Sequence, residues 1–121
     1  MQNLAVQAYG DIQQRTASER DIERAILEQV TDALKEVLHT SDKSPAKKAD
    51  AISRNLKLWT VFATDLGSPD NALPDDLKSN LLGLYEFVRQ SSFSMLSGAA
   101  ENISELIEIN ESVIGGLNSN A

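Results

Sequence analysis

The sequence predicts an all-α protein: a small bundle of four main helices preceded by an N-terminal arm or short extra helix. Apolar residues recur at the helical spacing i, i+3, i+4 through most of the chain, whereas no stretch alternates apolar and polar residues for the length of a strand. Clusters of proline, glycine and small polar residues divide this pattern into four segments. We expect one domain at 18–117, between an arm at 1–17 and a frayed tail at 118–121.

The first helix is expected from Ser18 to about Leu38. Ser18 and Asp21 have the spacing of a capping box, in which two side chains accept hydrogen bonds from the first backbone N–H groups. His39 follows at the C-terminus, where a positive imidazolium favours the helix dipole. The predicted buried stripe of this helix comprises Ile22, Ala25, Ile26, Val30, Ala33, Leu34, Val37 and Leu38.

The second helix is expected to begin at Ser44-Pro45, a capping residue followed by a proline that is tolerated in the first turn. Gly67 is its expected end. Trp59, the only tryptophan, is predicted to lie in the core, with an anchoring contact to a partner protein as the alternative. The apolar stripe comprises Ala49, Ile52, Leu56, Trp59, Phe62, Ala63 and Leu66.

Two further helices follow the loop at 67–74. The third is expected to start with Pro74 in its first turn, to carry Leu77, Leu81, Leu84 and Val88 as its apolar stripe, and to extend toward Met95 or Leu96. Gly98 breaks this pattern.

The fourth helix is expected from about Asn102 to Gly115-Gly116. Asn110 falls in the middle of its apolar stripe, and a buried amide is destabilising unless it is hydrogen-bonded. We therefore expect Asn110 to bond to another helix; a role in fixing the register of a partner is the alternative.

Composition excludes several classes of function. The 121 residues include 11 Lys+Arg and 18 Asp+Glu, which gives a net charge of -7, and there is no cysteine. Such an acidic chain offers little attraction to nucleic acid or to an anionic membrane, and no segment has the long apolar run that a membrane-spanning helix needs. We expect a cytoplasmic protein, since the first residues lack the pattern of a signal peptide.

No catalytic apparatus is visible in the sequence. The single histidine, His39, has no second histidine or cysteine to complete a metal site or a nucleophile pair. Asp70, Asp75 and Asp76 lack the spacing of a calcium-binding loop and are better explained by a turn and a helix N-terminus. We predict no catalytic residue, no metal and no cofactor; an enzyme would require convergent carboxylates in a deep cleft.

Apolar residues exceed what one buried face per helix requires. Leu58, Val61 and Tyr85 lie on secondary faces of their helices and are candidates for a groove that accepts an amphipathic segment; Tyr9 is a further candidate. This surplus suggests a binding module or a chaperone for a helical client.

Residues 58–77 resemble the signature of the flagellar biosynthesis regulator FlaF family, and Ala8-Tyr9-Gly10 and Leu106 to Asn110 extend the resemblance over nearly the whole chain. The matching positions are Leu58, Trp59, Asp65, Leu66, Pro69, Asn71, Leu73, Pro74, Leu77 and Leu81. The motif also predicts a stiff corner: Asn71 should bond to nearby backbone, Asp65 should accept a hydrogen bond from the loop, and Leu73 should pack on Leu77.

The resemblance implies a cytoplasmic protein that binds flagellin as a chaperone or export accessory factor and promotes flagellin synthesis and secretion. The expected partner is flagellin, through its C-terminal helical region, with the regulator FlbT as a further candidate. The alternative is a post-transcriptional regulator of flagellin messenger that acts directly or through FlbT. Direct RNA binding is disfavoured by the charge of -7 and by the lack of interleaved basic and aromatic residues.

Overall fold

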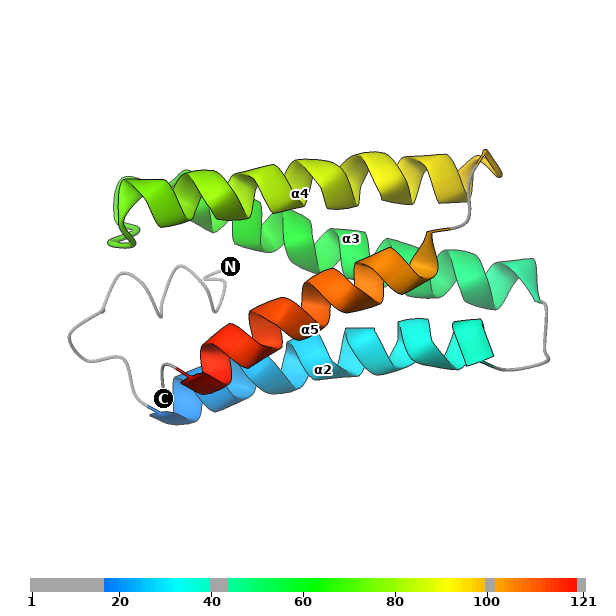
Figure 1. Cartoon of the computed structure of the whole chain (residues 1–121), viewed down its shortest axis with the longest axis horizontal. Helices are drawn as coiled ribbons and strands as arrows, with labels where there is room; N and C mark the ends of the chain where they lie inside the picture. The colour runs from blue at the N-terminus through cyan, green and yellow to red at the C-terminus, as the bar shows by residue number, and fades with distance from the viewer. Residues whose placement is uncertain (1–16, 40–43, 100–101, 120–121) are drawn as a thin grey trace.

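The computed structural model describes residues 17–39, 44–99 and 102–119, and within them it confirms an all-α bundle (Figure 1). The helices are α2 (Ala17–His39), α3 (Pro45–Leu66), α4 (Asp75–Leu96) and α5 (Ile103–Ser119). None of these helices is long and apolar enough to cross a bilayer. The arm at 1–17 lies almost wholly outside the described residues.

The four helices run alternately up and down the long axis (Figure 1). α3 runs back along α2, α4 runs back along α3, and α5 returns diagonally across α2. The main contacts join α2 to α5, α3 to α4, and α2 to α3. α4 therefore packs mainly on one neighbour, and part of its circumference stays exposed.

Local sequence signals explain most helix ends. The Ser44 hydroxyl accepts a hydrogen bond of 3.4 Å from the Lys47 backbone N–H, and Pro45 is the first residue of α3, as expected. Pro74 is the N-cap of α4, with a ψ of 147°, and so lies one position before the first turn in which we expected it. α4 ends at Leu96 with Ser97 as its C-cap, and the next residue, Gly98, has a φ of +82°, a conformation that favours glycine.

Two expected helix ends are wrong. α2 already begins at Ala17, so Ser18 lies inside the first turn and is not the N-cap. α5 continues through Gly115-Gly116 to Ser119. Each of the two glycines inside the helix is destabilising by only about 1 kcal/mol relative to alanine. Burial of Ile103, Leu106 and Ile107 stabilises α5 by about 1.5–3 kcal/mol for each side chain.

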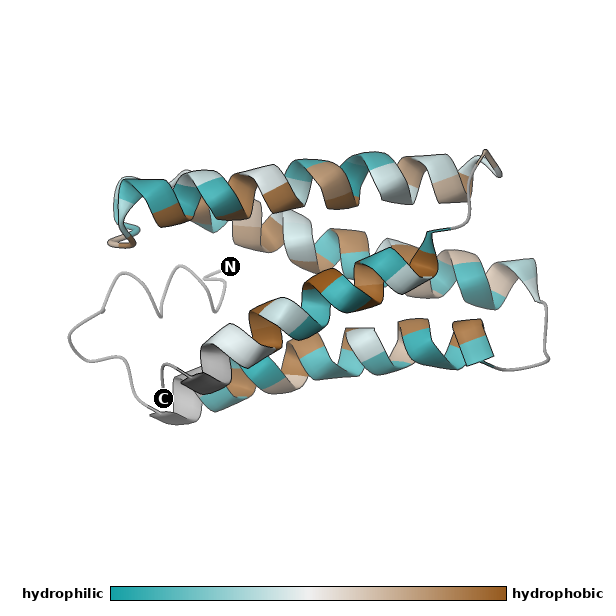
Figure 2. Cartoon of the chain, in the orientation of Figure 1, coloured by the Kyte–Doolittle hydropathy of each residue, from teal (hydrophilic) through white to brown (hydrophobic). Residues whose placement is uncertain are grey.

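The core lies where the helices converge, and the hydrophobic residues of α2 and α4 concentrate on the sides that face it (Figure 2). Trp59 is 2% exposed, which confirms its core position. The buried core cluster comprises Leu34, Ala51, Ile52, Trp59, Val88, Met95, Ile103, Leu106 and Ile107.

The expected buried stripe of α2 is partly wrong. Ile22 and Leu38 are exposed, whereas Glu23, Leu27 and Thr31 are buried. The buried face of α2 is therefore rotated by about one residue from the expected face. It includes Glu23 and Thr31, which a prediction based on apolar residues alone leaves out.

Candidate functional site

Three helices meet at a buried group of polar side chains, which we call the polar cluster. Asn110 of α5 lies at its centre: its Oδ1 accepts a hydrogen bond of 2.9 Å from Trp59 Nε1, and its Nδ2 donates to Thr31 Oγ1 at 3.1 Å and to Asn55 Oδ1 at 2.7 Å. Thr31 in turn donates to the Leu27 carbonyl at 2.7 Å. These bonds confirm that Asn110 is hydrogen-bonded to other helices.

The polar cluster links α2, α3 and α5 through side chains that are almost completely buried. Asn55 contributes only as an acceptor, because its Nδ2 is buried without a hydrogen-bond partner. A buried bond inside a low-dielectric core is strong, and a misaligned helix would leave several such groups unpaired. The cluster therefore specifies how these three helices fit together.

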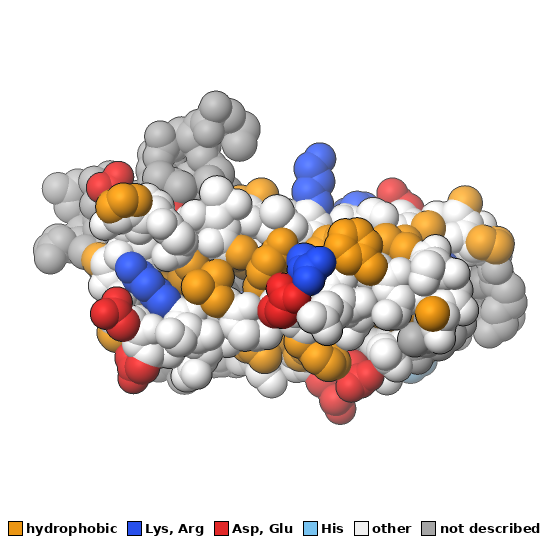
Figure 3. Space-filling model, turned by 90° about the horizontal axis from the view of Figure 1, so that it is seen from above, with side chains coloured by type: hydrophobic (Ala, Val, Ile, Leu, Met, Phe, Trp, Pro, Cys, Tyr) orange, Lys and Arg blue, Asp and Glu red, His pale blue; other side chains and the backbone are white. Residues whose placement is uncertain are grey.

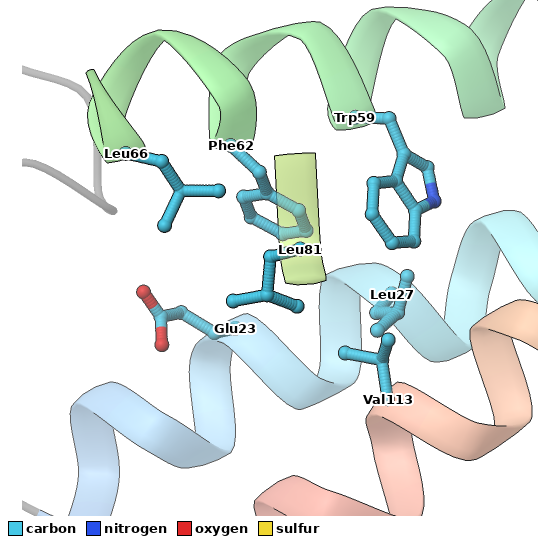
Figure 4. A pocket seen from close by; sticks show the side chains of 7 residues that line it. All are labelled: Glu23, Leu27, Trp59, Phe62, Leu66, Leu81 and Val113. Atoms are coloured by element: carbon cyan, nitrogen blue, oxygen red, sulfur yellow. The ribbon is translucent and has the colours of Figure 1, made fainter. Parts of the chain in front are cut away.

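An apolar cavity of about 60 Å³ lies beside Trp59, on which the polar cluster also depends. Figure 4 shows the side chains that line it. All four helices contribute to its wall, and the Trp59 ring forms one side, at 6.2 Å and 74° from the Phe62 ring. Its lining residues are Glu23, Leu27, Trp59, Phe62, Leu66, Leu81 and Val113. The cavity exceeds the space of one water but is smaller than the ~150 Å³ that admits benzene, so it suits a side chain rather than a whole helix.

The loop between α3 and α4 forms the predicted corner. Asp65 Oδ2 accepts a hydrogen bond of 3.1 Å from Asn71 Nδ2, and Asn71 Oδ1 accepts one of 3.0 Å from the Leu73 backbone N–H. Lys78 Nζ donates to the Asn71 carbonyl at 2.7 Å. Asp65 and Asn71 are both buried, so these residues fix the direction in which α4 leaves α3.

One side of α4 presents a second row in which four apolar residues flank one arginine; we call it the α4 strip: Leu82, Tyr85, Arg89, Phe93 and Leu96. These positions are separated by three or four residues and so lie on one face of the helix. Leu82, Phe93 and Leu96 are between 39% and 52% exposed. Seen from the α4 side, hydrophobic side chains run along the molecule and are interrupted by charged ones (Figure 3).

Arg89 stands in the middle of the α4 strip. Its Nε donates to Glu86 Oε1 at 3.0 Å, and its guanidinium lies 5.7 Å from the centre of the Phe93 ring. The hydrogen bonds from Arg89, and then from Gln90, lower the pKa of Glu86 to about 2. The same contact raises the pKa of Arg89, so both groups stay charged on this surface.

The residues predicted for partner binding lie in different places. Leu58 and Val61 are half-buried on α3, and Tyr85 is half-buried, packs against the core cluster and belongs to the α4 strip. None of the three lines the apolar cavity. Tyr9 lies outside the described residues.

The sequence analysis missed Glu23 and Leu27 of the cavity wall, and Leu82, Phe93 and Leu96 of the α4 strip. The second row could have been found by searching α4 for two apolar stripes, since its spacing is regular. Glu23 gives no such signal, because charged residues seldom lie in a buried helix face. In the described parts of the chain, no group of three or more acidic or histidine residues is placed to hold a metal ion.

The comparisons with known proteins give one match. The family model described as flagellar protein FlaF matches residues 5–117. No curated protein and no solved structure matches the chain. Because the family match covers most of its length, the chain belongs to the flagellar protein FlaF family.

Proposed function

We propose that this protein binds the C-terminal helical region of flagellin in the cytoplasm, as a chaperone or export accessory factor. Membership of a flagellar protein family supports a flagellar client. The observation that carries the proposal is the α4 strip, in which Leu82, Phe93 and Leu96 are exposed on a helix that packs mainly on one neighbour.

The α4 strip has the form that a helical client requires. Leu82 and Leu96 are 14 residues apart, so the row is about 21 Å long. Side chains separated by three or four residues fit between those of an amphipathic helix laid alongside. Arg89 would orient this helix by pairing with an acidic residue beside its apolar face.

Binding at the α4 strip would shield apolar residues of flagellin before export. A protein that holds unassembled flagellin can also couple flagellin supply to its synthesis, so promotion of both synthesis and secretion follows from one interaction. FlbT remains a proposed second partner within this scheme.

The test measures binding of the full chain to full-length flagellin and to flagellin without its C-terminal helix. We expect loss of binding for the shortened flagellin and at least about a tenfold weaker affinity for Phe93→Glu, since a charge would be placed in the apolar contact. Phe87→Glu is the matched control, because Phe87 is also an exposed phenylalanine of α4 but lies roughly 120° around the helix.

Equal recovery of both flagellins would contradict docking through the C-terminal region. Equal effects of Phe93→Glu and Phe87→Glu would contradict the α4 strip as the contact. Salt-dependent retention of the protein on flagellin messenger would instead favour the regulator of translation.

A further inference from the structure

Arg89 is held in one orientation on the surface of α4. Its Nε and Nη2 groups donate to the two carboxylate oxygens of Glu86, and Gln90 Nε2 donates to Glu86 Oε2 at 2.9 Å, so the carboxylate is itself fixed. The guanidinium also lies 5.7 Å from the centre of the Phe93 ring. An arginine held by both a carboxylate and an aromatic ring loses less side-chain entropy when it binds a further group.

One edge of the Arg89 guanidinium stays available to a ligand. The contact with Glu86 uses Nε and Nη2, whereas Nη1 has no hydrogen-bond partner among the residues that the structure describes. The Arg89 side chain is 37% exposed, so a ligand can reach it. The N–H groups of Nη1 and Nη2 form a planar fork that matches the two oxygens of a second carboxylate. We call this fork the free edge of Arg89.

The residues on both sides of Arg89 indicate where this carboxylate lies in its own polypeptide. Leu82 and Leu96 are each seven residues from Arg89, about 10 Å along the helix in opposite directions, and both are exposed. A terminal carboxylate ends its chain, so a helix that ended at Arg89 would contact only one half of the α4 strip. An acidic side chain inside a helix leaves apolar residues to contact both halves.

We propose that the α4 strip selects a helix with an internal aspartate or glutamate between two groups of apolar residues, and that the free edge of Arg89 binds this acidic side chain. Each apolar group lies about two helical turns from the acidic residue, to match Leu82 and Leu96. A helix shifted along the strip would leave its carboxylate against apolar residues, so the same pair fixes the register. This selectivity rests on the proposed function, because it concerns the helix that occupies the same strip.

The test compares amphipathic peptides that have the same apolar face and differ at one position. Each peptide is an amidated helix of about 18 residues, long enough to span the α4 strip, and its central residue is glutamate, glutamine or lysine. Fluorescence anisotropy of the labelled peptide measures its affinity for the full chain. We expect the glutamate peptide to bind at least about tenfold more tightly than the lysine peptide, which brings like charges together, with the glutamine peptide in between.

Substitutions of Arg89 should change this preference in a predictable way. Arg89→Glu should reverse it, so that the lysine peptide binds more tightly than the glutamate peptide. Arg89→Lys should keep only part of it, since an ammonium group has no planar fork. A reversal cannot come from loss of folding, so it separates recognition from a structural role.

Arg54→Glu is the matched control. Arg54 is also an exposed arginine, and its Nη1 lies 3.9 Å from the Asp50 carboxylate one turn earlier, but it belongs to α3. We expect the preference for the glutamate peptide to be unchanged in this variant.

Equal affinities of the glutamate and lysine peptides for the unchanged chain would overturn the selectivity, whereas flagellin binding and its loss in Phe93→Glu would persist. Failure of every peptide to bind would overturn it as well, and titration with flagellin itself would then decide the proposed function separately. An unreversed preference in Arg89→Glu would contradict Arg89 as the binding group. A glutamine peptide with a free C-terminal carboxylate that binds as tightly as the glutamate peptide would contradict an internal acidic residue.

Discussion

Trp59 Nε1 donates a hydrogen bond of 2.9 Å to Asn110 Oδ1, across 51 residues of sequence. The bond ties α3 to α5, although this pair is not among the helix pairs with the most extensive contacts, which are α2 with α5, α3 with α4, and α2 with α3. Because the same Asn110 amide also bonds to Thr31 of α2, one side chain defines the relative positions of three helices. α4 is tied in separately, through the corner at Asn71.

The polar cluster should respond unequally to removal of its two asparagines. Asn110→Ala removes three hydrogen bonds and leaves the Trp59 indole N–H buried and unpaired, whereas Asn55→Ala removes one bond together with an unpaired Nδ2. Both side chains are fully buried, so the lost volume is the same. We expect Asn110→Ala to be more destabilising than Asn55→Ala by about 2 kcal/mol in urea unfolding. Equal effects would contradict the central role of Asn110.

Two glycine-to-alanine substitutions should have opposite signs. Gly98 has a φ of +82°, and an added Cβ would meet nothing within 4 Å, so Gly98→Ala tests backbone conformation alone. We expect it to be destabilising by about 1–2 kcal/mol. Gly83 lies inside α4 with equally open surroundings, so Gly83→Ala should be stabilising by about 0.5–1 kcal/mol. Thermal unfolding measures both, and equal signs would contradict the conformation at Gly98.

The corner should depend on Asn71 more than on its exposed neighbour. Asn71→Ala removes the bonds to Asp65 Oδ2 and to the Leu73 backbone N–H, in a buried setting. We expect a loss of about 1–3 kcal/mol in the free energy of unfolding. Asp70 is the exposed residue just before Asn71, and Asp70→Ala should change the free energy of unfolding by no more than about 0.5 kcal/mol. If the two variants unfold alike, the corner is not held by the Asn71 side chain.

The carboxyl group of Glu86 should have an unusually low pKa. Its pKa of about 2, against an ordinary 4.5, reflects hydrogen bonds donated first by Arg89 and then by Gln90. Because the folded pKa is depressed, the stabilisation by this contact is present above pH 4.5 and is lost as the pH falls toward 2. The side-chain carboxyl signal of Glu86 in an NMR titration measures the pKa directly. Arg89→Gln should raise it toward 4.5, and an unchanged pKa would contradict the contact.

The sequence was sufficient for most of the fold and for part of the site. Pro45 and Gly98 are local signals that need no tertiary context, and they locate helix ends well. Asn110 could be recognised as buried because it interrupts an apolar stripe. Its three partners could not be named, because they depend on how the helices pack.

The buried face of α2 and the exposed residues of α4 could not be predicted from the sequence, for physical reasons. The buried face of α2 includes Glu23 and Thr31, so counting apolar residues gave a face that was slightly rotated. The exposure of Leu77 and Phe93 depends on which side of α4 has a neighbour. Hydrophobic periodicity shows which apolar residues share a helix face, but it does not show which other helix covers that face.

The central proposal is that the α4 strip binds a helical segment of flagellin. The most direct measurement is an NMR titration of the labelled full chain with the C-terminal segment of flagellin, in which each backbone amide reports its own change. We predict the largest shifts for amides of the α4 strip, at Leu82, Phe93 and Leu96, with smaller shifts near Phe87. Shifts confined to α2 and α5, or no shifts at saturating flagellin segment, would contradict the account.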